Sequence, residues 1–160
     1  LDNYLRIGDS LRKELLIVNR QVRSLSQTDT YIKNYEILIS MPGFGLHTSM
    51  TYLVELGDIR RFYRLDNLCC FVGLIPRMHG SGDKMWTGKM VKRGRKELKI
   101  MLIEASWRAI SIDPALMAKY NELKKKMNGN KAIIRIARKM LSRMRYLLMH
   151  QHRYEMGIVE

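Results

Sequence analysis

The sequence predicts an all-α protein, a helical bundle that contains a helix-hairpin-helix motif and is preceded by a long amphipathic helix. Apolar residues recur at steps of three or four, turns rich in glycine and proline separate these stretches, and no convincing strand pair is present. With 160 residues, 46% of them hydrophobic, the chain is long enough for a domain with a core. We expect residues 1–28 to form a connecting or assembly helix and residues 29–160 the helical domain.

The first helix is expected from Asp2 to about Ser24. Its apolar positions keep a step of three or four residues: Leu5, Leu11, Leu15, Val18, Val22 and Leu25. Basic residues occupy its other side: Arg12, Lys13, Arg20 and Arg23. Such a helix is either a linker or half of a dimerising coiled coil, and fewer than four clean heptads leave both interpretations open.

A second helix is expected from Asp29 or Thr30 to about Ser40, and a third from Thr48 to Leu56. Between them stands the turn Met41-Pro42-Gly43-Phe44-Gly45. Two short helices joined by such a turn describe a helix-hairpin-helix, here about residues 36–56. Its glycines, Gly43 and Gly45, would let backbone N–H groups hold a DNA phosphate. The alternative is an ordinary turn in which both glycines only supply positive φ angles.

The remaining helices are expected over four stretches: Asp66–Val72, Lys96–Ile112, Asp113 to about Met127, and Lys131 to His150. The stretch Lys96–Ile112 is apolar almost all round, which predicts a buried central helix. Asp113 followed by Pro114 is typical of a helix start, because aspartate caps a helix and proline suits its first turn.

Residues 73–94 are expected to form a long loop that holds Ser81 between Gly80 and Gly82. Glycine on both sides lets a hydroxyl approach a partner closely. A Gly-Ser-Gly serine is nevertheless usually a turn residue, and a nucleophilic serine needs a group that takes its proton. The spacing to His79 or Lys84 does not identify such a group, so the residues alone leave both interpretations open.

The charge balance points to a polyanionic partner. The chain has 29 Lys and Arg against 15 Asp and Glu, a net charge of +14, and nucleic acid is the commonest partner of such a protein. The densest run is expected to contact phosphates: Lys84, Lys89, Lys92, Arg93, Arg95, Lys96 and Lys99. Within this run, Trp86 either stacks on a base or anchors the loop. A membrane partner is not expected, because no apolar run could span a bilayer and the cations are spread along the chain.

The cysteines and aspartates predict no metal site in this chain. Cys69 and Cys70 are adjacent, have no partner at zinc spacing and are expected to be reduced core residues of a cytosolic protein. The aspartates are scattered singly. Because the chain begins at Leu1 rather than methionine, we expect it to be a piece of a longer protein.

Several short motifs follow one another in a fixed order: Met41-Pro42-Gly43-Phe44-Gly45, Glu55-Leu56-Gly57-Asp58-Ile59-x-x-Phe62, Phe71-Val72-Gly73-Leu74-x-Pro76, Ser81-Gly82, Gly88, and Lys92-Arg93-Gly94-x-x-x-Leu98. The ordered set resembles the C-terminal transposase domain of the insertion-sequence 110/116/902 family, over roughly Ile37 to Leu148. Two departures are mild: Ser49 stands where the family often has alanine, and Arg95 and Lys99 replace residues that are more often Asn or Asp and Arg.

The resemblance implies a DNA recombinase of mobile elements. The family's serine falls on Ser81, which is expected to attack a DNA phosphodiester and form a phosphoserine link. Metal-binding acids belong to an N-terminal RuvC-like domain outside these residues, so magnesium is expected only there and no cofactor in this chain. The isolated chain is expected to bind nucleic acid but to cleave poorly.

The resemblance also implies the partners and the location. The expected partners are DNA, a structured guide-type RNA, the RuvC-like domain and further copies of the chain, in the cytoplasm of a bacterium or archaeon. The alternative function is a non-catalytic helix-hairpin-helix module that binds DNA or RNA or serves assembly, with Ser81 an ordinary loop residue.

Overall fold

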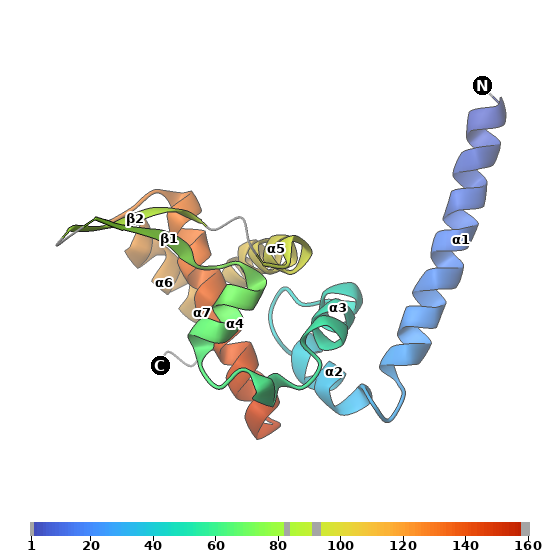
Figure 1. Cartoon of the computed structure of the whole chain (residues 1–160). Coiled ribbons are helices and arrows are strands. Elements are labelled where there is room, and N and C mark those ends of the chain that lie inside the picture. Colours follow the sequence, from blue (N-terminus) through green and yellow to red (C-terminus); the bar gives the residue numbers. More distant parts are fainter. Residues whose placement is uncertain (1, 82–83, 91–93, 158–160) are drawn as a thin grey trace.

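The computed structural model describes residues 2–81, 84–90 and 94–157, and between 76 and 90 it describes the backbone alone. In chain order the elements are α1 (Asp2–Ser26), α2 (Ile32–Ile39), α3 (Leu46–Leu56), the 3-10 helix η1 (Ile59–Arg61), α4 (Leu65–Val72), β1 (Pro76–Ser81), β2 (Lys84–Met90), α5 (Lys96–Ile112), α6 (Pro114–Lys124) and α7 (Gly129–His150). Figure 1 shows the helical body with α1 and the β1–β2 hairpin projecting from it in different directions.

The all-α prediction is confirmed for the core, but the prediction of a long loop over 73–94 is wrong. Strands β1 and β2 form an antiparallel hairpin in which Met78 pairs with Thr87 and Ser81 with Lys84. The sequence of this segment lacks the alternation of apolar and polar residues that a half-buried strand produces, so its periodicity gave no signal.

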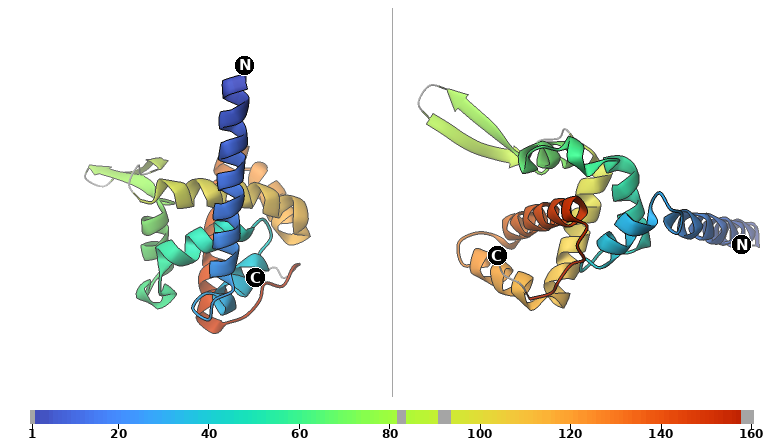
Figure 2. Two further views of the ribbon diagram at one scale, coloured as in Figure 1. Left: turned by 90° about the vertical axis from the view of Figure 1, so that its right-hand side faces the viewer. Right: turned by 90° about the horizontal axis from the view of Figure 1, so that it is seen from below.

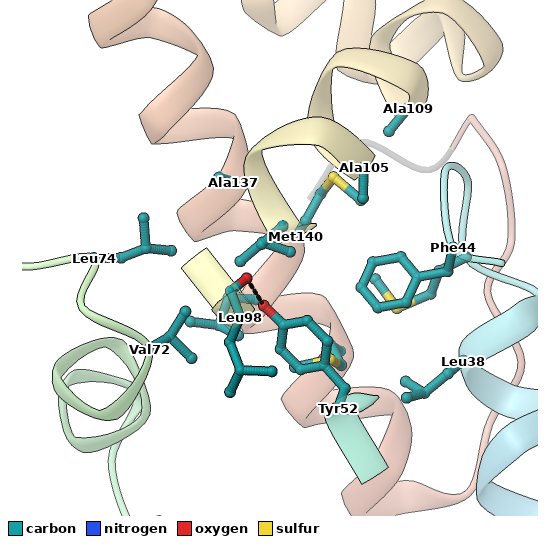
Figure 3. Close-up of a cluster of buried hydrophobic side chains, with 14 of the residues drawn as sticks. Leu38, Phe44, Tyr52, Val72, Leu74, Leu98, Ala105, Ala109, Ala137 and Met140 are labelled. Carbon is teal, nitrogen blue, oxygen red and sulfur yellow. Dashed lines mark hydrogen bonds between the residues drawn. The ribbon is translucent and has the colours of Figure 1, made fainter. Parts of the chain in front are cut away.

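Helix α7 runs through the centre of the body and contacts α2, α4, α5, α6 and η1. Its predicted apolar stripe is buried: Ile133, Ile136, Ala137, Met140, Leu141, Met144, Leu147 and Leu148. In the part of the core drawn in Figure 3, the hydroxyl of buried Tyr52 donates a hydrogen bond of 2.7 Å to the backbone carbonyl of Leu98. This bond ties α3 to the first turn of α5.

Helix α5 has the predicted bounds, yet the prediction that it is buried all round is wrong. Ile100 and Trp107 are each 42% exposed, because the neighbouring helices cover only the stripe that contains Leu102 and Ala109. The rings of Trp107 and of Tyr120 on α6 pack in a T-shaped arrangement, with their centres 5.7 Å apart. The two cysteines also differ: Cys69 is buried, as predicted, whereas Cys70 is exposed.

Helix α1 projects from the body with its N-terminal end farthest away (Figures 1 and 2). Only its C-terminal end is anchored, with Ser26 buried, Val22 packed against the core and contacts to α3. Its other predicted apolar positions are exposed, as the values for Leu11 (60%) and Leu15 (61%) illustrate. Within the described residues, no helix has both the length and the apolar composition needed to cross a membrane.

Candidate nucleic-acid interface

The hairpin leaves the body through a narrow neck in which two glycines meet. Gly73 ends α4 in the left-handed conformation with φ +82°, and Gly94 has φ +103°. Immediately after Gly94, the backbone N–H of Arg95 donates to the carbonyl of Phe71 at 2.9 Å. This hydrogen bond joins the two chain segments where the hairpin meets α4 and α5.

Ser81 is the last residue of β1, at the far end of the hairpin from the neck. At about 3.3 Å per residue, a strand of this length places its last residue about 17 Å from its first. Lys84 is the first residue of β2 and the backbone partner of Ser81, and Gly80 pairs with Met85. The structure thus places Ser81 and Lys84 opposite one another at the tip of a projecting element (Figure 1).

Other predicted site residues on the hairpin are described only in part. Gly82, Lys92 and Arg93 lie outside the described residues, and Lys89 is placed on β2 by its backbone. Their predicted contacts with phosphates therefore stay predictions.

Arg95 stands at the base of the neck, where its side chain is described. Its Nε lies 3.2 Å from a carboxylate oxygen of Glu55 on α3, and its guanidinium lies 5.9 Å from the centre of the Phe71 ring. More than half of the Arg95 side chain remains exposed. The residue therefore couples α3 to the neck and still presents positive charge to solvent.

The turn between α2 and α3 gives its two predicted glycines different surroundings. Gly43 has φ +83°, and a Cβ built on it would lie 2.2 Å from the carbonyl oxygen of Ala105 in α5. Gly45 is exposed, caps α3 with φ −116° and would have open space around a Cβ. Gly43 therefore has a packing role, whereas only Gly45 stands at an accessible helix N-terminus.

The predicted residues are not all brought together. Gly43 touches α5 at Ala105, which at a rise of about 1.5 Å per residue is about 15 Å along the helix from Arg95. The serine tip lies farther away, at the end of the hairpin. The predicted residues therefore lie in three places: the α2–α3 turn, the base of the hairpin at Arg95, and the hairpin itself.

One region of the surface was missed from the sequence. The connection between α3 and α4 carries Arg60, Arg61, Tyr63 and Arg64, all of them exposed. The run Arg-Arg-Phe-Tyr-Arg, in which an aromatic pair stands among arginines, is the signal that could have identified it.

No group of three or more His, Cys, Asp or Glu side chains that could hold a metal ion occurs among the described residues. The acidic groups near the neck, Glu55 and Asp66, lie instead in ion pairs with Arg95 and Arg138. These residues do not form a metal-binding set.

Comparison with known proteins places this helical domain and its projecting hairpin among the transposases. Residues 35–121, just over half of the chain, match the model of the Transposase IS116/IS110/IS902 family. The chain therefore belongs to the IS116/IS110/IS902 family of transposases, and the resemblance seen in the motifs is confirmed.

Individual relatives agree. The chain is 39% identical over 67 residues to the transposase for insertion sequence element IS1111A of Coxiella burnetii, a match covering 42% of this chain and 18% of that protein. It is 28% identical over 138 residues to the insertion element IS110 uncharacterized 43.6 kDa protein of Streptomyces coelicolor, covering 83% and 34%. A probable family 20 transposase of Pseudomonas aeruginosa is 26% identical over 97 residues, covering 61% and 28%. The chain thus spans about a third or less of these relatives.

Proposed function

We propose that this chain is the serine-bearing, DNA-binding domain of a transposase that cuts and rejoins DNA strands during transposition of an insertion sequence. The observation that carries the proposal is the position of Ser81, which ends β1 at the tip of a projecting hairpin in a member of this transposase family. A DNA duplex is too wide to enter a pocket. A serine at the end of a projecting hairpin can instead reach a phosphodiester on the outside of the duplex.

The proposed reaction conserves the energy of the broken bond. The Ser81 oxygen loses its proton and attacks phosphorus, a P–O bond to serine forms, and the P–O bond to the leaving sugar hydroxyl breaks as that oxygen gains a proton. Attack by a hydroxyl of another strand reverses these steps and rejoins the DNA. Lys84, Lys89, Lys92 and Arg93 would neutralise phosphates around Ser81, and Gly80 and Gly82 would permit its close approach.

Contacts with the DNA backbone away from the serine are part of the same proposal. The α2–α3 pair would act as a helix-hairpin-helix in which the amides at the start of α3, after Gly45, hold a phosphate. Such a contact would be independent of base sequence. Gly43 would serve it indirectly, by seating the turn on α5.

The remaining components are assigned outside this chain. Magnesium would be held by the acids of a RuvC-like domain, a structured guide-type RNA would select the DNA, and the whole protein would act in the bacterial cytoplasm. The described residues contribute a cationic body and the hairpin that carries the serine.

Helix α1 supports an assembly role beside the catalytic one. Leu11, Leu15, Val18, Val22 and Leu25 follow alternating steps of four and three, the spacing of a coiled-coil seam. Since most of this seam is exposed, pairing with α1 of a second copy would remove it from water. Analytical ultracentrifugation tests this: the double variant Leu11→Asp, Leu15→Asp should shift the chain to a monomer.

The serine mechanism is tested with a transposase that contains both domains and a DNA substrate nicked so that the cleaved strand cannot be rejoined. A covalent protein–DNA adduct should form, and mass spectrometry should map it to the peptide that contains Ser81. Ser81→Ala should abolish the adduct and strand exchange while leaving DNA binding intact. The matched control is Ser111→Ala, which alters an exposed serine on α5. Recombination by Ser81→Ala would make the chain a non-catalytic DNA- or RNA-binding or assembly module.

A further inference from the structure

Tyr63 is 85% exposed, a higher fraction than any other large hydrophobic residue in the described part of the chain. It belongs to residues 59–64, which we name the Tyr63 loop, between α3 and α4. The preceding residue, Phe62, is only 6% exposed. A single exposed aromatic side chain is ordinary on a protein surface, so the surroundings of Tyr63 decide its meaning.

Hydrogen bonds from α7 and from Asp58 fix the backbone of the Tyr63 loop. Arg145 of α7 donates from Nε to the carbonyl of Phe62 at 2.9 Å and from Nη2 to the carbonyl of Tyr63 at 2.8 Å. At the start of the loop, the Asp58 carboxylate accepts the backbone N–H of Arg60 at 2.9 Å. Because these hydrogen bonds fix the backbone on both sides of Tyr63, the ring is already exposed in a defined position before a ligand binds. Less conformational entropy is then lost on binding.

Positive charge surrounds the ring. Arg60 and Arg64 are exposed and have no side-chain partner among the described residues. Of the nearby carboxylates, Glu55 pairs with Arg95 and Asp66 with Arg138. Asp58 accepts the backbone N–H of Arg60 and keeps its own negative charge, but three arginines of the loop outnumber it. The loop therefore combines an uncovered π-face with an excess of positive charge.

The Tyr63 loop continues into the neck of the hairpin. The Arg61 guanidinium lies 4.7 Å from the centre of the Phe62 ring and 5.0 Å from that of Phe71, and Arg95 lies near the same Phe71 ring. The backbone carbonyl of Phe71 also accepts the backbone N–H of Arg95. The ring contacts and this hydrogen bond together link the loop to the base of the hairpin that carries Ser81.

We propose that the Tyr63 loop binds a single-stranded segment of DNA beside the hairpin, with an unpaired base stacked on Tyr63 and adjacent phosphates paired with Arg60 and Arg64. A base offers its face to a protein ring only where it is unstacked, and aromatic rings within cationic surfaces are the usual means of holding single strands. The inference rests on the proposed function, because strand exchange at Ser81 supplies the unpaired DNA.

The test measures the affinity of this chain for a fluorescent single-stranded 20-nucleotide DNA of mixed sequence by anisotropy, at several salt concentrations. Tyr63→Ala should weaken binding roughly tenfold, as expected for one lost stacking contact, while Tyr63→Phe should retain the affinity. The double variant Arg60→Ala, Arg64→Ala should reduce the slope of log K against log salt by about 1.4, the value for two phosphates on a single strand.

Matched controls lie on α1, which projects away from the loop (Figure 2). Tyr4 is 80% exposed, and Arg6 and Arg20 are exposed arginines. Tyr4→Ala and the double variant Arg6→Ala, Arg20→Ala should leave the single-strand affinity unchanged.

Wild-type affinity in Tyr63→Ala overturns the proposal. An equal loss for a duplex or an RNA of the same sequence overturns the assignment to single-stranded DNA. A change in self-association with unchanged DNA affinity would make the loop a protein contact and likewise overturn it. These outcomes are separate from the adduct assay: absence of a Ser81 adduct defeats the serine mechanism, whereas unchanged affinity of Tyr63→Ala defeats only the binding loop.

Discussion

Gly94 lies against Gly73 with no room for a side chain between them. A Cβ built on Gly94 would stand 2.7 Å from both the Cα and the amide nitrogen of Gly73, and 3.0 Å from the carbonyl oxygen of Phe71. The two chain segments of the neck can approach this closely only because residue 94 has no side chain, and this contact lies where the hairpin leaves the body.

Gly94→Ala should therefore destabilise the neck. The new methyl group meets backbone rather than a flexible side chain, and alanine is strained at φ +103°, so we expect a loss of about 2 kcal/mol or more in the free energy of unfolding. The matched control is Gly57→Ala, also at positive φ but with open space around the added Cβ. Urea unfolding and protease cleavage within residues 74–93 provide the measurements. Equal losses for the two variants would show that the close approach is not limiting.

The two glycines of the α2–α3 turn should respond differently to alanine. Gly43→Ala would place a methyl group 2.2 Å from the Ala105 carbonyl oxygen and should lower the free energy of unfolding by about 3 kcal/mol. Gly45→Ala adds a methyl group in open space, so it should change stability by less than about 1 kcal/mol. If the start of α3 holds a phosphate, Gly45→Ala should still weaken DNA binding. Thermal melting and DNA titration of both variants separate packing from binding, and an unaltered melting temperature for Gly43→Ala would contradict the packing role.

Ser49→Ala should stabilise the protein. Ser49 is fully buried in α3, and its hydroxyl has no hydrogen-bond partner among the described residues. Burying an unpaired hydroxyl is costly, so its removal should raise the free energy of unfolding by about 1 kcal/mol.

The control for this prediction is Ser106→Ala. Ser106 is equally buried, but its hydroxyl donates to the carbonyl of Leu102 at 2.6 Å, so its removal should not stabilise. Urea unfolding of both variants gives the comparison. A loss of stability in Ser49→Ala would mean that the hydroxyl is satisfied in solution.

Asp113 should make stability depend on pH. Its buried carboxylate accepts hydrogen bonds from the Tyr154 hydroxyl and from the amide of Ala115, and it lies 3.8 Å from Arg143. Burial by itself raises the pKa of Asp113, but the hydrogen bonds from Tyr154 and Ala115 outweigh it and bring the pKa below its usual value. The carboxylate therefore contributes stability above the unfolded pKa of about 4, and this contribution is lost as the pH falls through the lower folded value.

Asp113→Asn should accordingly cost about 1–3 kcal/mol at pH 7, and the difference from wild type should shrink toward pH 3. The free energy of urea unfolding measured across this range provides the comparison. A difference that is constant with pH would show that the charge of Asp113 contributes nothing.

Much of the helical core could be predicted from the sequence. The bounds of α5 and the buried stripe of α7 agree with the spacing of apolar residues at steps of three and four. Helices that pack against one another need this spacing, because it places the apolar side chains on one face. The start of α6 at Asp113 and Pro114 was also predicted, because capping is decided by neighbouring residues. The exposure of Trp107 was not, since it depends on which helices lie beside α5.

The candidate site was predictable only in its residue types. Ser81 and the basic run after it stand out in the sequence. The hairpin that pairs Ser81 with Lys84 does not, because its residues lack the alternation of apolar and polar side chains by which a strand is recognised. The Tyr63 loop was missed because its presentation depends on Arg145, which lies more than eighty residues later in the chain.

The amino-acid sequence by itself determined the helices, the charge and the family, because periodicity, capping and ordered motifs are local properties of the chain. Only the tertiary structure decided that Gly94 meets Gly73, that Gly43 is needed against Ala105, and that Tyr63 stands uncovered. Each of these depends on close contacts or hydrogen bonds between residues far apart in sequence, and such contacts exist only once the helices have packed.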